Sequence, residues 1–367
     1  MAIIFRVLIL GFFALCTPLV WACAICAPDD TQGTVASRLR AADRIVLAQL
    51  QPDGKLAQAK FTVRGALPAQ ALPIAGWVST EPTSHRQGQG NLVVLLMNAG
   101  SPDWLALGFM PASRADWLIT VAAMPRLDPG VTASKDQTLF FLRDLEDATP
   151  LVAQAAFEEV AVRPYAGLRA VRAELNRQRI VQWLQAPAAS VNPERRSRFA
   201  LYYLLLGLSG NANDASAIES TISQPDAARN GKEHSAMLAA LLDLRGDAGL
   251  AWVEQRYLSN PDVADDDMQA ALLALSVQGG DGARVSQAQV VAMYARFIRS
   301  NPQRAGFVAS DLAAWGRWEF AEALAQALRS QRQQVFASRY AIVFYLLRNP
   351  RPEVKALVEA LRAEKLL

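Results

Sequence analysis

The stretch Tyr202-Tyr203-Leu204-Leu205-Leu206-Gly207-Leu208-Ser209-Gly210-Asn211-Ala212 is an apolar run that stops at a glycine and restarts at a polar residue. Such a break is typical of a helix that ends at a left-handed glycine and is followed by a capped helix. The pattern returns at Gly246 and Gly280, which follow at intervals of 36 and 34 residues, and Gly316 comes after another 36. A break near every 35 residues predicts stacked pairs of helices.

Secondary breaks lie about halfway between these glycines, as expected if each repeat is a pair of helices. They fall at Pro164, Pro187 and Pro193, Pro225, Pro261, and Asn301-Pro302. Apolar residues recur at helical spacing from about Asp144 to Leu367, where roughly six pairs fit. No pair can bury its apolar face alone, so the pattern predicts an α-helical solenoid over residues 144–367. The tetratricopeptide signature is missing, and we therefore expect an irregular HEAT-like array.

The residues before Asp144 contain short strand-like runs with turn signals between them. The turn Pro52-Asp53-Gly54-Lys55 lies between the strand-like residues 44–50 and 59–64. This pattern predicts a hairpin with one solvent-exposed face. Further strands are expected at residues 76–78, 91–97, 104–109, 116–121 and 137–142, and a short helix at residues 29–42 with Asp30 or Thr31 as its N-cap. This pattern predicts a small antiparallel β barrel or sandwich, OB-like, over residues 23–140. The expected fold class is therefore α+β with more than one domain.

The first residues have the composition of a secretory signal. Arg6 precedes the apolar run at residues 7–15, and the small residues Ala22-Cys23-Ala24 resemble a signal-peptide cleavage site. The apolar core is shorter than the ~20 residues that span a bilayer. We expect a signal peptide over residues 1–22 and export of the mature chain to the periplasm or cell envelope.

Composition excludes two classes of protein. The chain has 367 residues, of which 52% are hydrophobic and 19% are charged, so disorder is excluded. Its length fits about two domains. The net charge is +3 and no run of basic residues marks a nucleic-acid surface, so we expect no nucleic-acid partner.

The motif Cys23-Ala24-Ile25-Cys26 is the one constellation that suggests chemistry. Two cysteines at this spacing can hold a disulfide, shuttle electrons or bind a metal, and soft thiolates favour Cu(I). Covalent haem attachment is excluded because residue 27 is alanine and not histidine. A closed zinc site needs four ligands, and the chain adds only His85 and His234, in different expected domains. Cys23 and Cys26 are thus candidate metal ligands or disulfide partners, and the cofactor is unknown.

Processing of the leader decides among these alternatives. Cleavage after Ala22 leaves Cys23 as the first residue, whereas cleavage after Ala24 removes it. Lipidation of Cys23 would make its sulfur a thioether, which excludes a bond to Cys26. A lipid anchor at Cys23 is the one membrane attachment that we expect.

No catalytic signature of the common hydrolases or of phosphate-binding loops is present in the sequence. We interpret His85 as a solvated loop residue and His234 as a solvated residue at a helix start. Asp265-Asp266-Asp267 lacks the interleaved spacing of a calcium loop and is expected to charge a helix N-terminus favourably. A hydrolase with scattered acidic residues stays open.

The motif Trp315-Gly316-Arg317-Trp318 places two indoles across a turn. Packing is the first interpretation, since apolar residues surround both tryptophans at helical spacing. An exposed ledge of Trp315, Arg317 and Trp318 that binds a partner is the alternative.

Several stretches resemble an uncharacterised family of exported bacterial proteins that is common in planctomycetes. The resemblance rests on the Cys23–Cys26 motif, Ala42-Asp43-Arg44-Ile45-Val46-Leu47-Ala48, Phe61-Thr62-Val63-Arg64-Gly65, residues 141–147, 156–159, 163–166 and 204–207, and Asp311-Leu312-Ala313-Ala314-Trp315. It implies export and a β domain followed by a helical array, and it supplies no activity. The first half also resembles the netrin/metalloproteinase-inhibitor module, an OB-like barrel, but departs from it in cysteine spacing and number.

Two functions follow from these observations. The first is a non-enzymatic binding or scaffolding module of the envelope that holds another envelope protein on its solenoid. The alternative is a thiol-redox or copper-handling protein that uses Cys23 and Cys26.

Overall fold

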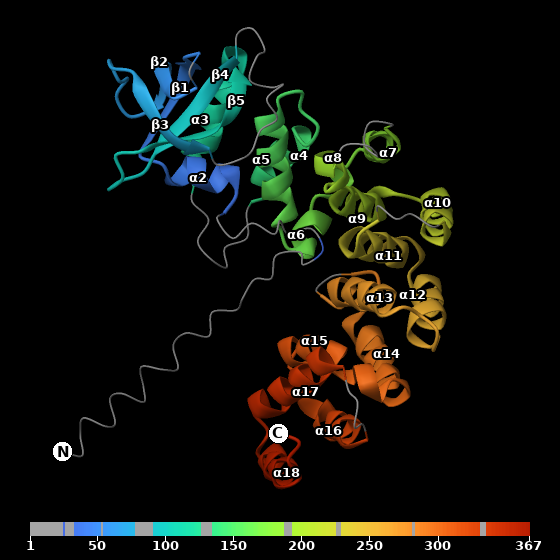
Figure 1. Cartoon of the computed structure of the whole chain (residues 1–367). Helices are drawn as coiled ribbons and strands as arrows, with labels where there is room; N and C mark the ends of the chain where they lie inside the picture. Colours follow the sequence, from blue (N-terminus) through green and yellow to red (C-terminus); the bar gives the residue numbers. More distant parts are fainter. Residues whose placement is uncertain are drawn as a thin grey trace, which may run out of the picture. The chain divides into compact units, whose positions relative to one another are not determined.

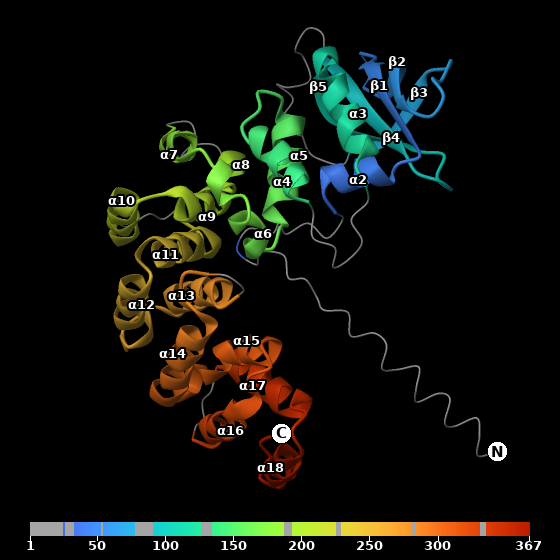
Figure 2. The same ribbon diagram turned by 180° about the vertical axis from the view of Figure 1, so that it is seen from behind.

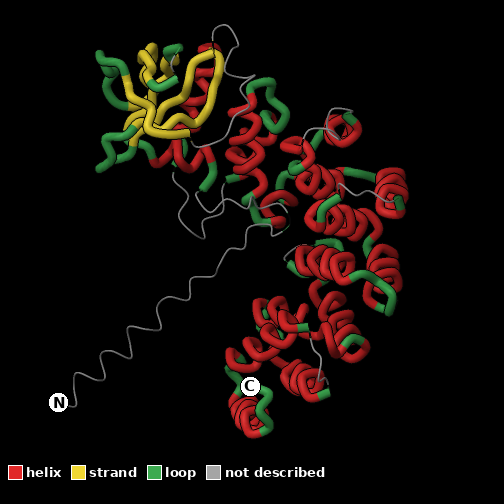
Figure 3. The backbone as a smooth tube through the Cα atoms, in the orientation of Figure 1, coloured by secondary structure: helices red, strands yellow, loops and turns green. Residues whose placement is uncertain are grey.

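A computed structural model of the chain describes residues 25, 33–52, 54–77, 91–125, 134–186, 193–224, 229–280, 283–330 and 335–367. The chain divides into two compact units between Val171 and Arg172 (Figure 1). The first unit contains all the described strands and the second contains described helices only, as Figure 3 shows by colour. The expected α+β class, with a sheet followed by many helices, is thereby confirmed.

Five strands form the sheet of the first unit. They are β1 (Arg44–Leu50), β2 (Leu56–Arg64), β3 (Leu72–Trp77), β4 (Asn91–Met97) and β5 (Trp104–Pro111). The strand order is β1-β2-β3-β5-β4, and β4 also pairs with β1, so the pairings form a ring. The expectation of an antiparallel sheet was wrong in one place, because β3 and β5 pair in parallel and the sheet is mixed.

Apolar side chains of the strands pack together into a hydrophobic core cluster. They come from all five strands: Val46, Ala48, Ala57, Ala59, Leu72, Val93, Leu95, Trp104, Ala106 and Phe109. Strand β4 is buried along its length from Leu92 to Leu96, which explains its unbroken apolar sequence. In β2 burial ends at Ala59, and Phe61 is 50% exposed, in keeping with the solvent-exposed face expected for this strand.

Two segments expected to be strands are helices. Residues 116–121 lie in α3 (Ala115–Ala123), where Trp117, Leu118 and Val121 are buried at helical spacing. Residues 137–142 lie in α4 (Lys135–Arg143). This helix begins with a capping box in which Ser134 Oγ accepts from the Gln137 amide and Gln137 Oε1 accepts from the Ser134 amide. Both short segments contain β-branched residues, but packing and capping outweigh that preference.

Three more helices complete the first unit. They are α2 (Val35–Ala41), α5 (Pro150–Ala161) and α6 (Tyr165–Arg169). Helix α2 is capped by Thr34 and not by Asp30 or Thr31. Helix α5 packs on α2, α4 and β5, so it belongs with the sheet. The boundary between the two compact units falls after Val171.

The second unit consists of helices in its described parts. They are α7 (Arg177–Gln185), α8 (Pro193–Arg196), α9 (Phe199–Ser209), α10 (Ala212–Ser223), α11 (Gly231–Arg245), α12 (Asp247–Val253), α13 (Asp265–Gln278), α14 (Gln287–Ser300), α15 (Ala309–Ala314), α16 (Ala321–Arg329), α17 (Phe336–Arg348) and α18 (Pro352–Ala363), with short helical turns η3 (Arg172–Glu174), η5 (Glu254–Leu258), η6 (Pro302–Val308) and η7 (Trp318–Phe320). None of the described helices is both long and apolar enough to cross a bilayer.

The predicted breaks separate these helices, although their backbone differs from expectation. Gly246 and Gly316 have positive φ values of 58° and 68°, but Gly246 has a ψ of −126° and so is not in the left-handed helical region that was expected. Gly210 is extended, with φ −82°, and α13 ends at Gly279, with φ −68°. Two of the four stops thus use a positive φ.

Helices α9, α11 and α13 lie side by side in one row, and α10, α12 and α14 lie in a second row (Figure 2). The contact between α9 and α11 is close because Gly207 has no side chain. A Cβ atom at Gly207 would lie 2.7 Å from the Cα atom of Ala240.

Polar contacts between neighbouring helix pairs join residues that lie about one repeat apart in the sequence, and some, such as Asp247–Gln289 and Leu258–Asn301, are 42 or 43 residues apart. Six side-chain contacts illustrate this. They are Arg177–Asp214, Arg196–Glu233, Asp243–Gln278, Ser276–Asp311 and Arg329–Glu364, which are 35 to 37 residues apart, and Glu254–Arg296, which are 42 apart. The separation of 35 to 37 residues matches the interval between the predicted breaks.

Candidate functional site

The cysteine motif lies outside the described residues, except for Ile25. Ile25 is fully buried, and the structure describes neither Cys23 nor Cys26. The predicted signal peptide and His85 also lie outside the described residues. The dithiol, the copper site and the lipid anchor therefore stay predictions.

Trp315, Arg317 and Trp318 lie around the turn between α15 and η7, and each is half-buried. The Trp315 ring stacks on Tyr294 at 5.8 Å and covers Gly279, where any side chain would collide with the indole. The Trp318 ring packs on Tyr345 at 5.2 Å. Arg317 Nε donates to Glu319 Oε1 at 2.6 Å. Both indoles thus pack within the unit and the Arg317 charge is paired, while partner binding at this turn stays a prediction.

His234 is buried inside the helical unit, so the expectation of a solvated helix start was wrong. Its Nδ1 lies 3.0 Å from Asp267 Oδ1 and its Nε2 lies 3.1 Å from the Tyr257 hydroxyl. Burial lowers the pKa of His234, Arg229 and Arg256 lower it further, and Asp267 opposes them. The order Asp-His-Tyr resembles a hydrolase relay, but Tyr257 is buried and only 3% exposed. We interpret His234 and Tyr257 as buried residues, and Asp267, whose side chain is 49% exposed, as the partner of His234 at the surface.

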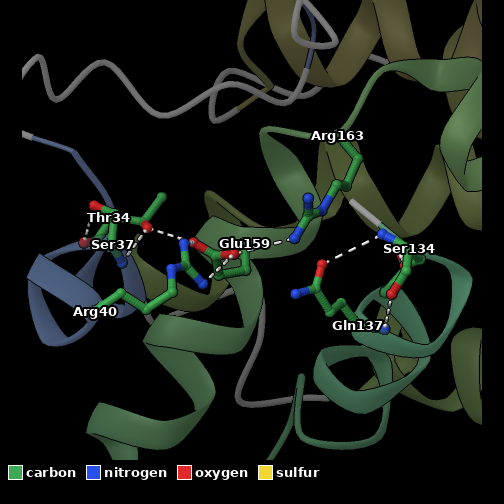
Figure 4. A network of polar contacts seen from close by, with 8 residues as sticks. Thr34, Ser37, Arg40, Ser134, Gln137, Glu159 and Arg163 are labelled. Carbon is green, nitrogen blue, oxygen red and sulfur yellow. Dashed lines mark hydrogen bonds and ion pairs between the residues drawn. The ribbon is translucent and has the colours of Figure 1, made fainter. Parts of the chain in front are cut away.

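A buried polar cluster joins α2 to α5 in the first unit (Figure 4). Glu159 is 2% exposed and accepts hydrogen bonds from Thr34, from both terminal nitrogens of Arg40 at 2.9 and 3.2 Å, and from Arg163 at 3.1 Å. Next to it, the Val35 amide donates to Glu158 Oε2 at 2.6 Å. Neither arginine is more than 6% exposed.

Arg40 and Arg163 both donate to the carboxylate of Glu159. Burial lowers the pKa of Arg163, Glu159 opposes that effect and Arg40 adds to it. Arg163 Nε has no hydrogen-bond partner among the described atoms. All members are enclosed, so the cluster offers no access to a substrate. The cluster attaches the N-terminal end of α2 to α5. The cap of α2, Thr34, lies eight residues after Cys26 in the sequence.

A pocket of about 580 Å³ opens on the second unit between α11, α13, η6 and α15. Its lining is mixed: Gly231, Lys232, Ser235, Asp266, Gln269, Ala270, Leu272, Leu273, Ser276, Phe307 and Asp311. Asp266 is exposed in the first turn of α13, so the expectation that residues 265–267 charge a helix N-terminus is confirmed. The lining has one more acidic than basic side chain.

Asp311 is the residue of this pocket whose electrostatics are unusual. Its Oδ1 accepts from Ser276 Oγ at 2.8 Å and its Oδ2 accepts from the Tyr294 hydroxyl at 2.7 Å. Burial raises the pKa of Asp311, and these two hydroxyl donors partly oppose it. Burial and the nearby Asp311 charge hold the pKa of Tyr294 well above its usual value. The described residues give Asp311 neutral donors and no ion pair.

This arrangement suits the binding of a cation. A carboxylate oxygen with one hydrogen bond retains a further lone pair, and a cationic donor would supply the missing charge. Leu273 and Phe307 provide apolar contact for the stem of such a group. Among the described residues there is no cluster of three or more His, Cys, Asp or Glu that could hold a metal ion.

Sequence reasoning did not find this site. Ser276, Tyr294 and Asp311 come from three helices, and Asp311 was noted only within a packing motif. The one available signal is that Ser276 and Asp311 lie 35 residues apart, which is one repeat.

No protein-family model, curated protein or solved structure matches this chain. The resemblance to the exported planctomycete-type family therefore stays a prediction.

Proposed function

We propose that the chain is a non-enzymatic binding or scaffolding protein of the cell envelope. Its helical unit would be a HEAT-like solenoid, and the pocket at Asp311 would hold a basic side chain of a partner protein. Export rests on the predicted signal peptide.

The solenoid is supported by the repeated separation of the contacts between helix pairs. In a stacked array each repeat touches only its neighbours, so contacts recur at one repeat length. The ion pairs Arg177–Asp214 and Arg196–Glu233 are each 37 residues apart, and Asp243–Gln278 and Ser276–Asp311 are each 35 apart. Neighbouring repeats of such arrays offer extended surfaces to protein partners.

An OB-like barrel is supported in the first unit by the order of its strands. The sequence β4-β1-β2-β3 across the sheet is that of a Greek key, and β5 lies between β3 and β4. Five strands in this order are typical of small OB-like barrels.

The observation that carries the proposed function is that Asp311 lines the pocket and that its carboxylate accepts two hydrogen bonds from neutral hydroxyls but has no ion-pair partner among the described residues. A charged group removed from water is stable when an opposite charge compensates it. A lysine or arginine side chain from a partner would supply that charge and would lay its methylenes on Leu273 and Phe307.

Peptide binding to the full chain tests this function. We would titrate short apolar peptides that contain one arginine, and matched peptides with glutamine in its place. Wild type should prefer the arginine peptides, and Asp311→Asn should weaken their binding by about tenfold or more, since hydrogen bonds to charged groups contribute about 1.5–3 kcal/mol. Asp262→Asn, at an exposed aspartate of the same unit that does not line the pocket, is the matched control.

The same variants apply to proteins recovered from an envelope extract. A partner held at the pocket should be retained by wild type and by Asp262→Asn and lost by Asp311→Asn. Equal binding of arginine and glutamine peptides, together with equal recovery by all three proteins, would contradict the proposal.

A further inference from the structure

Helix α17 exposes a line of large apolar side chains, which we name the α17 stripe. Its members are Phe336, Tyr340, Phe344 and Leu347, with exposed fractions of 83%, 65%, 47% and 52%. Their spacing of four, four and three residues places them on one face of the helix. The opposite face is buried through Ser338, Ile342, Tyr345 and Leu346. A helix on a protein surface normally turns polar residues to the solvent, so this exposed face needs an explanation.

The surroundings of the α17 stripe are cationic. Residues 323–352 contain five arginines and no aspartate or glutamate, but Arg329 pairs with Glu364 and Arg351 lies 3.9 Å from Glu319. We therefore assign the charge beside the stripe to Arg339 and Arg348. Within α17, the Arg348 guanidinium lies 5.1 Å from the centre of the Phe344 ring, and Arg339 donates to the Leu366 carbonyl. Arg339 and Arg348 therefore place positive charge on α17 beside the stripe, which favours an occupant that is apolar and anionic.

A second copy of the chain fits these properties less well than an anionic surface does. A second copy of the chain would bring the same arginines together without an acidic partner, which opposes association. The stripe and Val335 together present roughly 400–500 Å² of apolar surface, estimated from their exposed fractions. A standard protein interface has ~800 Å² per partner, of which a little over half is apolar, so this area does not discriminate between a protein and a membrane, and the charge beside the stripe decides.

An anionic lipid surface fits them better. Aromatic and leucine side chains on one helix face, flanked by arginines, are the features of helices that lie in the membrane interface. A bilayer demands no matched shape from a ridge one helix wide, and its negative headgroups attract the flanking arginines. We propose that α17 lies on an anionic membrane surface, with the α17 stripe in the headgroup and acyl boundary and Arg339 and Arg348 at the headgroups. This goes beyond the proposed function, since it involves a different surface and a different ligand.

Vesicle co-sedimentation of the full chain tests the inference. Every protein would carry Cys23→Ser, so that no lipid anchor contributes, and the vesicles would be phosphatidylcholine with or without phosphatidylglycerol. The test variant is Phe336→Ser with Tyr340→Ser, and Arg348→Gln tests the charge. The matched control is Phe61→Ser with Leu67→Ser, at residues of the first unit that are 50% and 52% exposed.

We expect the wild-type chain and the control to sediment with the anionic vesicles and to be released as salt increases. The double stripe variant should bind at least about tenfold more weakly, because it removes two inserted aromatic rings. Arg348→Gln should weaken binding by a smaller factor. Unchanged circular dichroism would show that the exposed substitutions leave the fold intact.

Three results would overturn the inference. The first is failure of the wild-type chain to bind anionic vesicles at low salt. The second is equal binding by the stripe variant or by purely zwitterionic vesicles. The third is that the stripe variant loses an acidic protein partner in the absence of any vesicle binding, which would assign the stripe to a protein. Asp311→Asn should bind vesicles as wild type does, so this test is independent of the pocket.

Discussion

Replacing Glu159 by glutamine removes the negative charge that Arg40 and Arg163 share. Glu159 accepts four hydrogen bonds in the cluster, three of them from arginine nitrogens. Both guanidinium groups are almost fully buried, so neither can regain its hydration in the folded chain. Removing one partner of a buried ion pair costs about 3–5 kcal/mol, and we expect Glu159→Gln to destabilise the first unit by that amount.

The same geometry predicts an unequal effect for the arginine partner. Arg163 gives Glu159 one hydrogen bond, and its Nε has no hydrogen-bond partner among the described atoms. Arg163→Met leaves Arg40 and Glu159 as a pair with two hydrogen bonds. It also removes the repulsion between the two guanidinium groups. We therefore expect Arg163→Met to cost about 1 kcal/mol.

Urea unfolding of the full chain, followed by far-UV circular dichroism, measures both effects. Glu359→Gln is the control, because Glu359 is 69% exposed and its one ion pair among the described residues is with the exposed Arg362. It should leave the unfolding midpoint unchanged. The reasoning is refuted if Glu159→Gln costs less than about 1 kcal/mol, which would mean that water reaches the cluster. It is equally refuted if Arg163→Met is as damaging as Glu159→Gln.

Three further predictions concern the helical unit and the N-terminus. Gly207→Leu should destabilise the unit by about 1–3 kcal/mol or more in urea unfolding, because its side chain would collide with Ala240; equal stability would contradict the close contact of α9 and α11. Burial acts to raise the pKa of Asp214, but the hydrogen bonds from Arg177 and a backbone amide lower it below its usual 3.8. A carboxyl group whose pKa is lowered by folding stabilises the fold above its unfolded pKa, and this stabilisation is lost as pH falls through the folded pKa. Arg177→Gln removes the main cause of the lowered pKa, so its thermal unfolding should depend less on pH below about 4 than that of wild type. The intact mass of the exported chain should show both cysteines without a lipid if the dithiol hypothesis holds, whereas a diacylglycerol adduct or a chain that begins at Ile25 would eliminate it.

The sequence predicted the elements whose signals are local and repeated. The strand at residues 44–50 was correct, and helices end near Gly210, Gly246, Gly280 and Gly316 as expected. Residues 116–121 and 137–142 were misassigned because a run of six residues fits either period. In the second case Ser134 and Gln137 carried a capping-box signal that pointed to a helix.

The candidate site could not be predicted in the same way. Ser276, Tyr294 and Asp311 lie in separate helices with ordinary local sequences. Their meeting depends on how α13, α14 and α15 pack, and the absence of a cation beside Asp311 is a property of that packing. The α17 stripe could not be predicted from the sequence for a different reason. Its apolar residues have the spacing expected of a core helix, and sequence alone does not tell which apolar face of a helix is covered.

The most direct test of the central claim is a crystal structure of the full chain with a bound arginine peptide. We predict that the guanidinium nitrogens lie within about 3 Å of the Asp311 carboxylate, with the side-chain methylenes against Leu273 and Phe307. A peptide bound elsewhere, with no cationic group at Asp311, would contradict the account.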